Sequence, residues 1–267
     1  MIVRKSAADV EKMRAAGRIV AEVLEAVEKA VVPGETTTAD LNNLAETICR
    51  ERGGVPTFLG YNNFPAAACI SVNEAVVHGI PDGRVLVSGD LVSFDFACTR
   101  GGYIADAAIT IPVGEVSAEA KRLLSVTREA LYQGIAKAKV GARIGEVASA
   151  IQRYVEAAGF TIVRELVGHG VGRHLHEGPE VPNFGKPGQG VRLMDGMTIA
   201  IEPMVNAGKR ETVTLPDKWT VVTKDGNLSA HFEHTVAITK RGPDILTLPF
   251  GAPVPHGVSM TPDAAVR

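Results

Sequence analysis

Four carboxylates lie inside apolar, strand-like runs of this 267-residue chain, and they constrain its fold more than any other feature. Asp95 lies in LVSFDFAC, Asp106 in YIADAAITI, Glu202 in TIAIEPM and Glu233 in HFEHTVAI. A carboxylate in such a run is expected to be buried, and an unpaired buried charge costs several kcal/mol or more. Basic partners are scarce near these positions, and none occurs between residues 193 and 207. The fold is therefore expected to bring the four charges to a cation.

The strand pattern places the first two carboxylates relative to each other. In LVSFDFAC the apolar side chains alternate with a second face that carries Asp95. Gly101-Gly102 is typical of a hairpin turn, which puts Asp106 opposite Ala97 on the next strand. Asp106 then shares a face with Asp95 as its diagonal neighbour, at about 7–8 Å between backbones. Two bare carboxylates so placed would repel each other and at least one pKa would rise, whereas bound divalent ions reverse this effect.

His169, in GHGVGRHLH, adds an imidazole to these acids, and the resulting set is rich in hard oxygen ligands. Several carboxylates can bridge two ions about 3.5–4 Å apart. The set predicts a dinuclear site for manganese, iron(II), cobalt or zinc, and leaves the choice of metal open. Taken singly, each acid could instead be a turn, cap or salt-bridge residue. The five candidate metal ligands are Asp95, Asp106, His169, Glu202 and Glu233.

Composition limits the class of protein independently. With 45% hydrophobic residues the chain can bury a large core, as one big domain or as two closely packed halves. No run approaches the ~20 apolar residues of a transmembrane helix, and MIVRKSAADVEK lacks the apolar stretch of a signal peptide, so a cytoplasmic location is expected. A formal net charge of −2 without a basic cluster disfavours nucleic acid and membranes as partners.

A faint internal repeat organises the chain. A helix capped by Ser6 is expected to end at Pro33-Gly34, and a second amphipathic helix follows it. The same plan recurs from Ser117, where a long helix is expected to end near Gly141 before a second one. Each helix pair precedes a block of strands, and each block supplies two of the four carboxylates. This pattern predicts two related α/β halves whose sheets meet around a central site, with helices on the outside.

Several motifs carry a resemblance to a known family. They are TFLGYNNFPAAACISVNEAVVHGIP, the pair Asp95 and Asp106, GHGVGRHLHEGP, AIEPM, KWTVVTKDG and HFEHTVAIT, in that order. Over about residues 5–248 the chain resembles the type I methionine aminopeptidases. The resemblance implies the pita-bread fold, an α/β (α+β) architecture with mainly antiparallel sheets, as one catalytic domain over residues 1–249 with pseudo-repeats at 6–115 and 117–248. Residues 250–267 are expected to form an irregular tail.

The resemblance also implies roles for the five ligands. Asp95 would serve one metal ion and His169 the other, while Asp106 and Glu233 bridge both. Glu202 would bind one ion and act as a proton shuttle.

Further site residues are implied by the same resemblance. His78 and His176 would hydrogen-bond the substrate peptide and support the developing tetrahedral centre, although a bare histidine beside Gly and Pro could be a satisfied loop residue. The residues expected to enclose a methionine side chain are Phe58, Tyr61, Phe64, Cys69, Leu175 and Trp219; ordinary core packing is their alternative. Phe58, Phe64 and Leu175 depart from the residues common in the family, which leaves pocket shape open.

The implied reaction is hydrolytic release of N-terminal methionine from nascent chains whose second residue is small. The implied partners are the N-terminal peptide of such chains and the ribosome, and the implied state is a monomer. Serine hydrolase, HExxH and P-loop motifs are absent from the sequence. A non-catalytic binding protein with the same fold is the second hypothesis, which release of methionine from a peptide would exclude.

Overall fold

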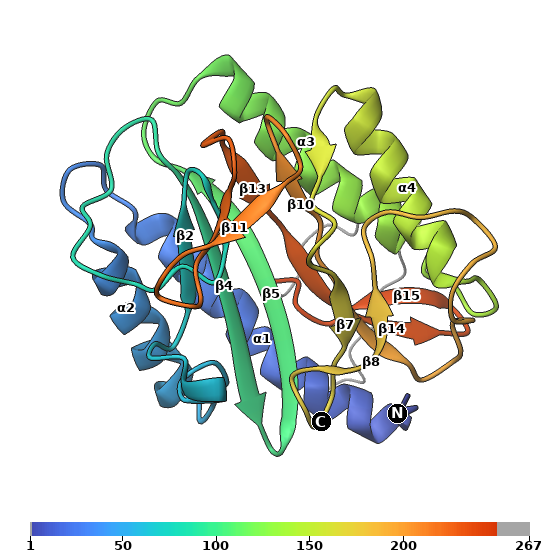
Figure 1. The fold of residues 1–267 in the computed structure, drawn as a ribbon. Coiled ribbons are helices and arrows are strands. Elements are labelled where there is room, and N and C mark those ends of the chain that lie inside the picture. Colours follow the sequence, from blue (N-terminus) through green and yellow to red (C-terminus); the bar gives the residue numbers. More distant parts are fainter. Residues whose placement is uncertain (1, 250–267) are drawn as a thin grey trace.

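Two helix pairs and the strands that follow them form the fold in residues 2–249, the part of the chain that the computed structural model describes (Figure 1). In this part the helices are α1 (Ala7–Ala30), α2 (Thr38–Glu51), α3 (Ala118–Ile135) and α4 (Ile144–Ala157), with a short 3-10 turn η1 (Tyr61–Asn63). None of them combines the length and hydropathy that a membrane span requires. The tail predicted at 250–267 lies outside the described residues.

Local side-chain contacts explain where three helices begin. The Ser6 hydroxyl accepts a hydrogen bond from the Asp9 amide, and the Asp9 carboxylate accepts one from the Ser6 amide. Thr37 and Asp40 form the same reciprocal pair at the start of α2, and Ser117 caps α3. Each cap satisfies amide groups that the first helical turn leaves without partners. The predicted starts at Ser6 and Ser117 are confirmed.

The predicted end of the third helix near Gly141 is wrong. Helix α3 ends at Ile135, and turns follow it. The Gly141 amide donates to the Leu193 carbonyl at 2.8 Å, and the Leu193 amide donates to the Ala142 carbonyl at 2.8 Å. These contacts draw the chain away from the helix axis towards a segment about fifty residues later, which no local pattern indicates.

A single antiparallel sheet dominates the described part of the chain. Its order is β1–β4–β5–β14–β9–β7–β8, with β2 paired to β4 and β15 paired to β14. The strands are β1 (Val55–Pro56), β2 (Cys69–Val72), β4 (Leu91–Arg100), β5 (Tyr103–Pro112), β7 (Gly168–Gly170), β8 (Glu177–Val181), β9 (Thr198–Ile201), β14 (Glu233–Thr239) and β15 (Gly242–Ile245).

Two small sheets flank the large one. The first has the order β13–β10–β6 and contains β13 (Ser229–His231), β10 (Met204–Asn206) and β6 (Thr161–Ile162). The second has the order β11–β12–β3 and contains β11 (Thr212–Thr214), β12 (Val221–Thr223) and β3 (Ala75–Val77). The α/β class with mainly antiparallel strands is confirmed, but strands from the two predicted halves join in one continuous sheet, at β5 and β14.

Alternation along β4 separates the core from the site. Phe94 and Phe96 are fully buried and belong to one apolar cluster with residues of α1 and α2. Figure 1 shows α1 behind β4. Burial of one such aromatic side chain contributes about 1.5–3 kcal/mol. Asp95 lies between them and points to the opposite face, where it lines a cavity. The hydrophobic effect at the helix-facing positions therefore fixes which way the acid points.

Helix α1 lies against the end of the described chain so closely that Gly17 cannot carry a side chain. A Cβ atom at Gly17 would lie 2.1 Å from the Leu246 carbonyl oxygen. We expect Gly17→Ala to lower the free energy of unfolding, because overpacking costs about 1–3 kcal/mol and helix propensity returns about 1 kcal/mol at most. Urea denaturation measures the difference. In the control, Gly134→Ala, the new Cβ meets the flexible end of Ile151, so a loss equal to that of Gly17→Ala would contradict the explanation.

Candidate metal centre and substrate cavity

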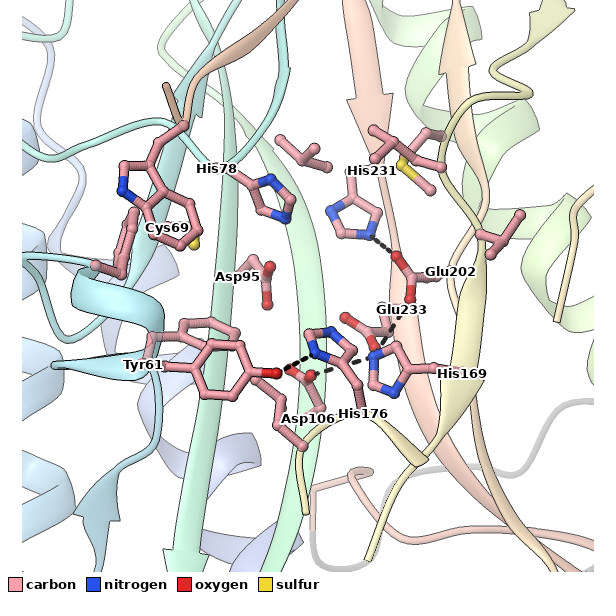
Figure 2. A pocket seen from close by; sticks show the side chains of 18 of the residues that line it. Tyr61, Cys69, His78, Asp95, Asp106, His169, His176, Glu202, His231 and Glu233 are labelled. Atoms are coloured by element: carbon pink, nitrogen blue, oxygen red, sulfur yellow. Dashed lines mark hydrogen bonds and ion pairs between the residues drawn. The ribbon is translucent and has the colours of Figure 1, made fainter. Parts of the chain in front are cut away.

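The β4–β5 hairpin places the two aspartates as predicted. Ala97 lies opposite Asp106, and Asp95 lies opposite Ala108, so the two acids are diagonal neighbours on one face. Gly101 and Gly102 form the turn with φ values of 56° and 76°, which glycine adopts without strain. Both carboxylates line the same cavity (Figure 2).

Glu202 follows the last residue of β9 and precedes Pro203, which donates no hydrogen bond to a ladder. The side-chain amide of Asn183, a fully buried residue, donates to the Glu202 carbonyl at 3.0 Å and fixes the backbone there. The Glu202 carboxylate oxygens lie 3.5 Å from His169 Nε2 and 3.8 Å from His231 Nε2. Glu202 therefore lies directly beyond the end of β9, and its side chain lines the cavity.

Glu233 is the first residue of β14, but the run HFEHTVAI is not one strand as its alternation suggested. The chain changes sheets at Phe232: His231 ends β13 and pairs with Met204 of β10, whereas Glu233 pairs with Ala108 of β5. The amide and the carbonyl of His231 both bond to the hydroxyl of Thr110 in β5. His231 and Glu233 nevertheless both line the cavity.

His169, in β7, is held in one tautomer. Its Nδ1 lies 2.9 Å from the Gly170 carbonyl, which can only accept, so Nδ1 carries the proton and Nε2 has a free lone pair. Burial lowers the pKa of His169 to about 4, and the ring is neutral at pH 7. Nε2 points towards the acids and lies 3.9 Å from Asp106 Oδ2. A neutral imidazole so oriented is the form that binds metal ions.

Within residues 2–249, no lysine or arginine lines the cavity into which the acids point. Burial raises the pKa of Asp106 to about 7. Burial, together with the charges of neighbouring acids, raises the pKa values of Asp95, Glu202 and Glu233 well above their usual range. Three buried carboxylate oxygens have no hydrogen-bond partner: Asp95 Oδ1, Asp106 Oδ1 and Glu233 Oε1. Native proteins rarely leave such atoms unsatisfied, so each calls for an explanation such as a bound ion.

A cavity of about 220 Å³ opens beside the acids. Its apolar wall has aromatic rings in edge contact: Phe64 lies 5.0 Å from Trp219 and 6.5 Å from Phe58 between ring centroids. Burial, and next the charge of Asp95, raises the pKa of the Cys69 thiol well above its usual range, so this wall is uncharged. All six residues predicted to enclose a side chain line this cavity: Phe58, Tyr61, Phe64, Cys69, Leu175 and Trp219.

Two histidines lie between the apolar wall and the acids. His78 has a left-handed φ of 59°, and burial lowers its pKa to about 4. Tyr61 directs its hydroxyl towards His176 and lies 2.7 Å from its Nδ1, as Figure 2 shows. The ring of His176 lies 4.4 Å from that of His169 between centroids. The structure thus brings both predicted histidines to the cavity, and Tyr61 contacts one of them in addition to lining the wall.

Three further histidines of the described chain, His174, His231 and His234, have different surroundings. His174 is exposed, and His234 bonds through Nδ1 to the Thr247 hydroxyl at 2.9 Å. His231 lines the cavity, and neither of its buried ring nitrogens has a hydrogen-bond partner. In the sequence, only the alternation in HFEHTVAI, which puts His231 on the same face as Glu233, indicated that His231 would lie near the acids. No sequence pattern indicated the contact between Asn183 and Glu202, because Asn183 lies in a loop without periodicity.

A family model described as metallopeptidase family M24 matches residues 11–240. The chain belongs to this family. Within it, the chain groups with methionine aminopeptidases: it is 51% identical to methionine aminopeptidase 1 of Bacillus subtilis over 92% of this chain and 99% of that protein. The solved methionine aminopeptidase of Thermotoga maritima matches with a TM-score of 0.91 and 47% identity, covering 93% of this chain and 100% of that one.

A more distant likeness concerns the fold alone. Prolidase from Pyrococcus furiosus has a TM-score of 0.71 and 24% identity, and the match covers 92% of this chain but 65% of that one.

The residues present fit the divalent metal that a metallopeptidase family implies. Ligand atoms of Asp106, His169 and Glu233 all lie within 4.8 Å of one another. The unsatisfied oxygens of Asp95, Asp106 and Glu233 and the free Nε2 of His169 form a donor set of hard oxygens and one imidazole. Such a set suits manganese, iron, cobalt or zinc in the divalent state.

Proposed function

We propose that this protein is a metal-dependent aminopeptidase that removes methionine from the N-termini of peptides and nascent chains. The observation that carries the proposal is that four carboxylates and one neutral imidazole line the same cavity of about 220 Å³. Asp106 and Glu233 are buried, and Asp95 and Glu202 are partly buried. The methionine aminopeptidases to which the chain is similar support the reaction and the substrate. We place its action in the cytoplasm, on chains at the ribosome, as a monomer.

Two divalent ions would balance the four negative charges of the ionised acids. Asp95 would bind one ion and His169 the other, with Asp106 and Glu233 between them. Glu202 would complete the set. Manganese, iron(II), cobalt and zinc all suit these ligands, and the metal identity is left to the experiment.

When bound, divalent ions supply a nucleophile from water at neutral pH and polarise the carbonyl of the peptide. Glu202 would accept the proton from the attacking water and pass it to the leaving amine. Its position directly after β9, with its side chain lining the cavity, supports this role. His78 and His176, which line the same cavity, would hydrogen-bond the peptide and support the oxyanion.

The apolar wall would select the first side chain. Aromatic edges and a neutral, polarizable thiol suit a thioether, and the cavity has room for one long side chain rather than a folded chain. A large second residue would crowd the wall of the cleft, so we expect a preference for small residues there.

Hydrolysis of the peptide Met-Ala-Ser tests the proposed function. We expect release of free methionine with added Mn²⁺ or Co²⁺, loss of activity after chelation, and recovery when the ion is returned. Amino-acid analysis of the products measures each step. Metal binding without release would favour the non-catalytic binding protein instead.

A further inference from the structure

The paired stretch between β5 and β14, here called the seam, is short, although each strand carries a candidate metal ligand. In the described chain, register between these strands extends over two pairs, Glu233 with Ala108 and His234 with Ala107. The neighbouring β4–β5 ladder has ten pairs. Asp106 lies just beyond one end of the seam, while Glu233 lies within it. Something other than a backbone ladder must therefore hold Asp106 relative to β14.

The hydroxyl of Thr235 holds Asp106 against β14 at one end of the seam. Thr235 Oγ1 accepts a hydrogen bond from the Asp106 amide at 2.9 Å and donates one to the Asp106 carbonyl at 2.8 Å. The Thr235 carbonyl is engaged elsewhere, with the Leu246 amide at 2.9 Å. A side chain thus takes the place that the backbone of β14 would occupy in a continued ladder.

Thr110 does the same at the other end of the seam. Its Oγ1 accepts from the His231 amide at 2.8 Å and donates to the His231 carbonyl at 2.7 Å. The Ser93 hydroxyl lies 2.9 Å from the same oxygen. Because Thr110 already donates its one proton to His231, Ser93 is the donor in this contact, and Thr110 Oγ1 accepts from both Ser93 and His231. Thr235 of β14 therefore bonds to β5 at one end of the seam, and Thr110 of β5 bonds to His231, the last residue of β13, at the other end.

Both threonines are rigid. Thr235 is fully buried and Thr110 is 5% exposed. Their β-branched side chains have few rotamers in a packed strand, so the position of each hydroxyl is well defined. Without it, an amide and a carbonyl would be buried without partners, and the local backbone would move to find others.

We propose that Thr235 and Thr110 are positioning residues of the metal centre. Their hydroxyls hold the backbone of Asp106 and His231 against the opposite strand and so set the separation between the Asp106 and Glu233 carboxylates. The inference rests on the proposed function, in which these two acids bind both ions. Metal ligation tolerates only small errors in ligand position, so the threonines control affinity without touching an ion.

Titration calorimetry of the metal-free protein with Mn²⁺ tests this inference. We expect Thr235→Val, which keeps the shape and removes the hydroxyl, to weaken Mn²⁺ binding by about 10–100-fold. Thr235→Ser keeps the hydroxyl and should stay within about threefold of the wild type. The matched control is Thr127→Val: Thr127 is equally buried, but its hydroxyl donates only to the Leu123 carbonyl within α3.

Wild-type affinity in Thr235→Val, or an equal loss in Thr127→Val, would overturn the inference. If Thr235→Val does not fold, Thr110→Val replaces it with the same expected loss and the same control. Failure of the wild type to bind Mn²⁺ would instead remove the proposed function. The two failures are therefore distinguishable in one set of titrations.

Discussion

Asp106→Asn is expected to lower kcat/KM on Met-Ala-Ser by more than about 100-fold. Loss of a residue that merely supports a metal ligand costs about 10–100-fold, and Asp106 is proposed to be a ligand of both ions. Asparagine keeps the size of the side chain and removes its charge, so packing is conserved. Peptide hydrolysis and Mn²⁺ titration of the same samples measure the loss.

The same substitution is expected to preserve or raise the stability of the metal-free protein. Burial raises the pKa of Asp106 to about 7 from a usual value of 3.8, so the folded state holds this proton more tightly than the unfolded state. Ionisation of Asp106 therefore lowers stability as the pH rises from about 4 through 7, and asparagine removes that cost. Thermal unfolding at pH 7.5 without metal measures this.

Asp90→Asn is the matched control for Asp106→Asn. Asp90 is a buried acid, but its carboxylate accepts hydrogen bonds from the Val87 amide and the Asn73 side chain. We expect its substitution to cost stability and to leave Mn²⁺ binding intact. Activity of Asp106→Asn close to that of the wild type would refute the metal centre.

Lys5→Met is expected to have the largest effect on stability. Lys5 Nζ lies 2.6 Å from Glu177 Oε2, and the two side chains are 4% and 7% exposed. Removing one partner of a buried pair leaves an uncompensated charge and costs about 3–5 kcal/mol, whereas an exposed pair contributes about 1 kcal/mol or less. Urea denaturation of the metal-free protein measures the change.

The Lys5–Glu177 pair also supports the loop that presents His176. Glu177 Oε1 accepts hydrogen bonds from the amides of Arg173 and His174 at 2.9 and 3.2 Å. Lys5→Met should therefore lower kcat/KM as well as stability. The double variant Lys5→Met/Glu177→Gln removes the unpaired charge and keeps the acceptor, so it should recover part of the stability. A loss below about 1 kcal/mol in Lys5→Met would show that the pair acts as an exposed one does.

The hairpin carrying Asp95 and Asp106 could be predicted in register because its determinants are local. A side-chain period of two and a glycine turn fix which residues face each other, and the observed pairing of Ala97 with Asp106 follows from them. The helix starts at Ser6 and Ser117 were predictable for the same reason, since a cap depends on residues three positions apart.

The four acidic ligand candidates could be recognised one by one from the sequence. Each is a charged residue inside an apolar run that is expected to be buried, and burial of an unpaired charge is unfavourable. That all five candidate ligands and the two histidines proposed to contact substrate line one cavity, however, depends on strands more than a hundred residues apart. Their metal-binding and catalytic roles stay predictions for the experiments above. Burial of the apolar strand faces brings the strands together, and the acids, which lie on the opposite face of these strands, are brought to one place as a result.

Long-range hydrogen bonds explain what could not be predicted. Thr235 bonds Asp106 and Tyr61 bonds His176 across separations of 129 and 115 residues, and a hydroxyl has no pattern that reveals such a partner. The break at Phe232 likewise arises because His231 and Glu233 find partners in different sheets. The sequence by itself thus specified the β4–β5 hairpin, the helix caps at Ser6 and Ser117, and the expectation that the four acids bind a cation. Packing of distant segments specified how the acids are spaced and which polar groups hold them there.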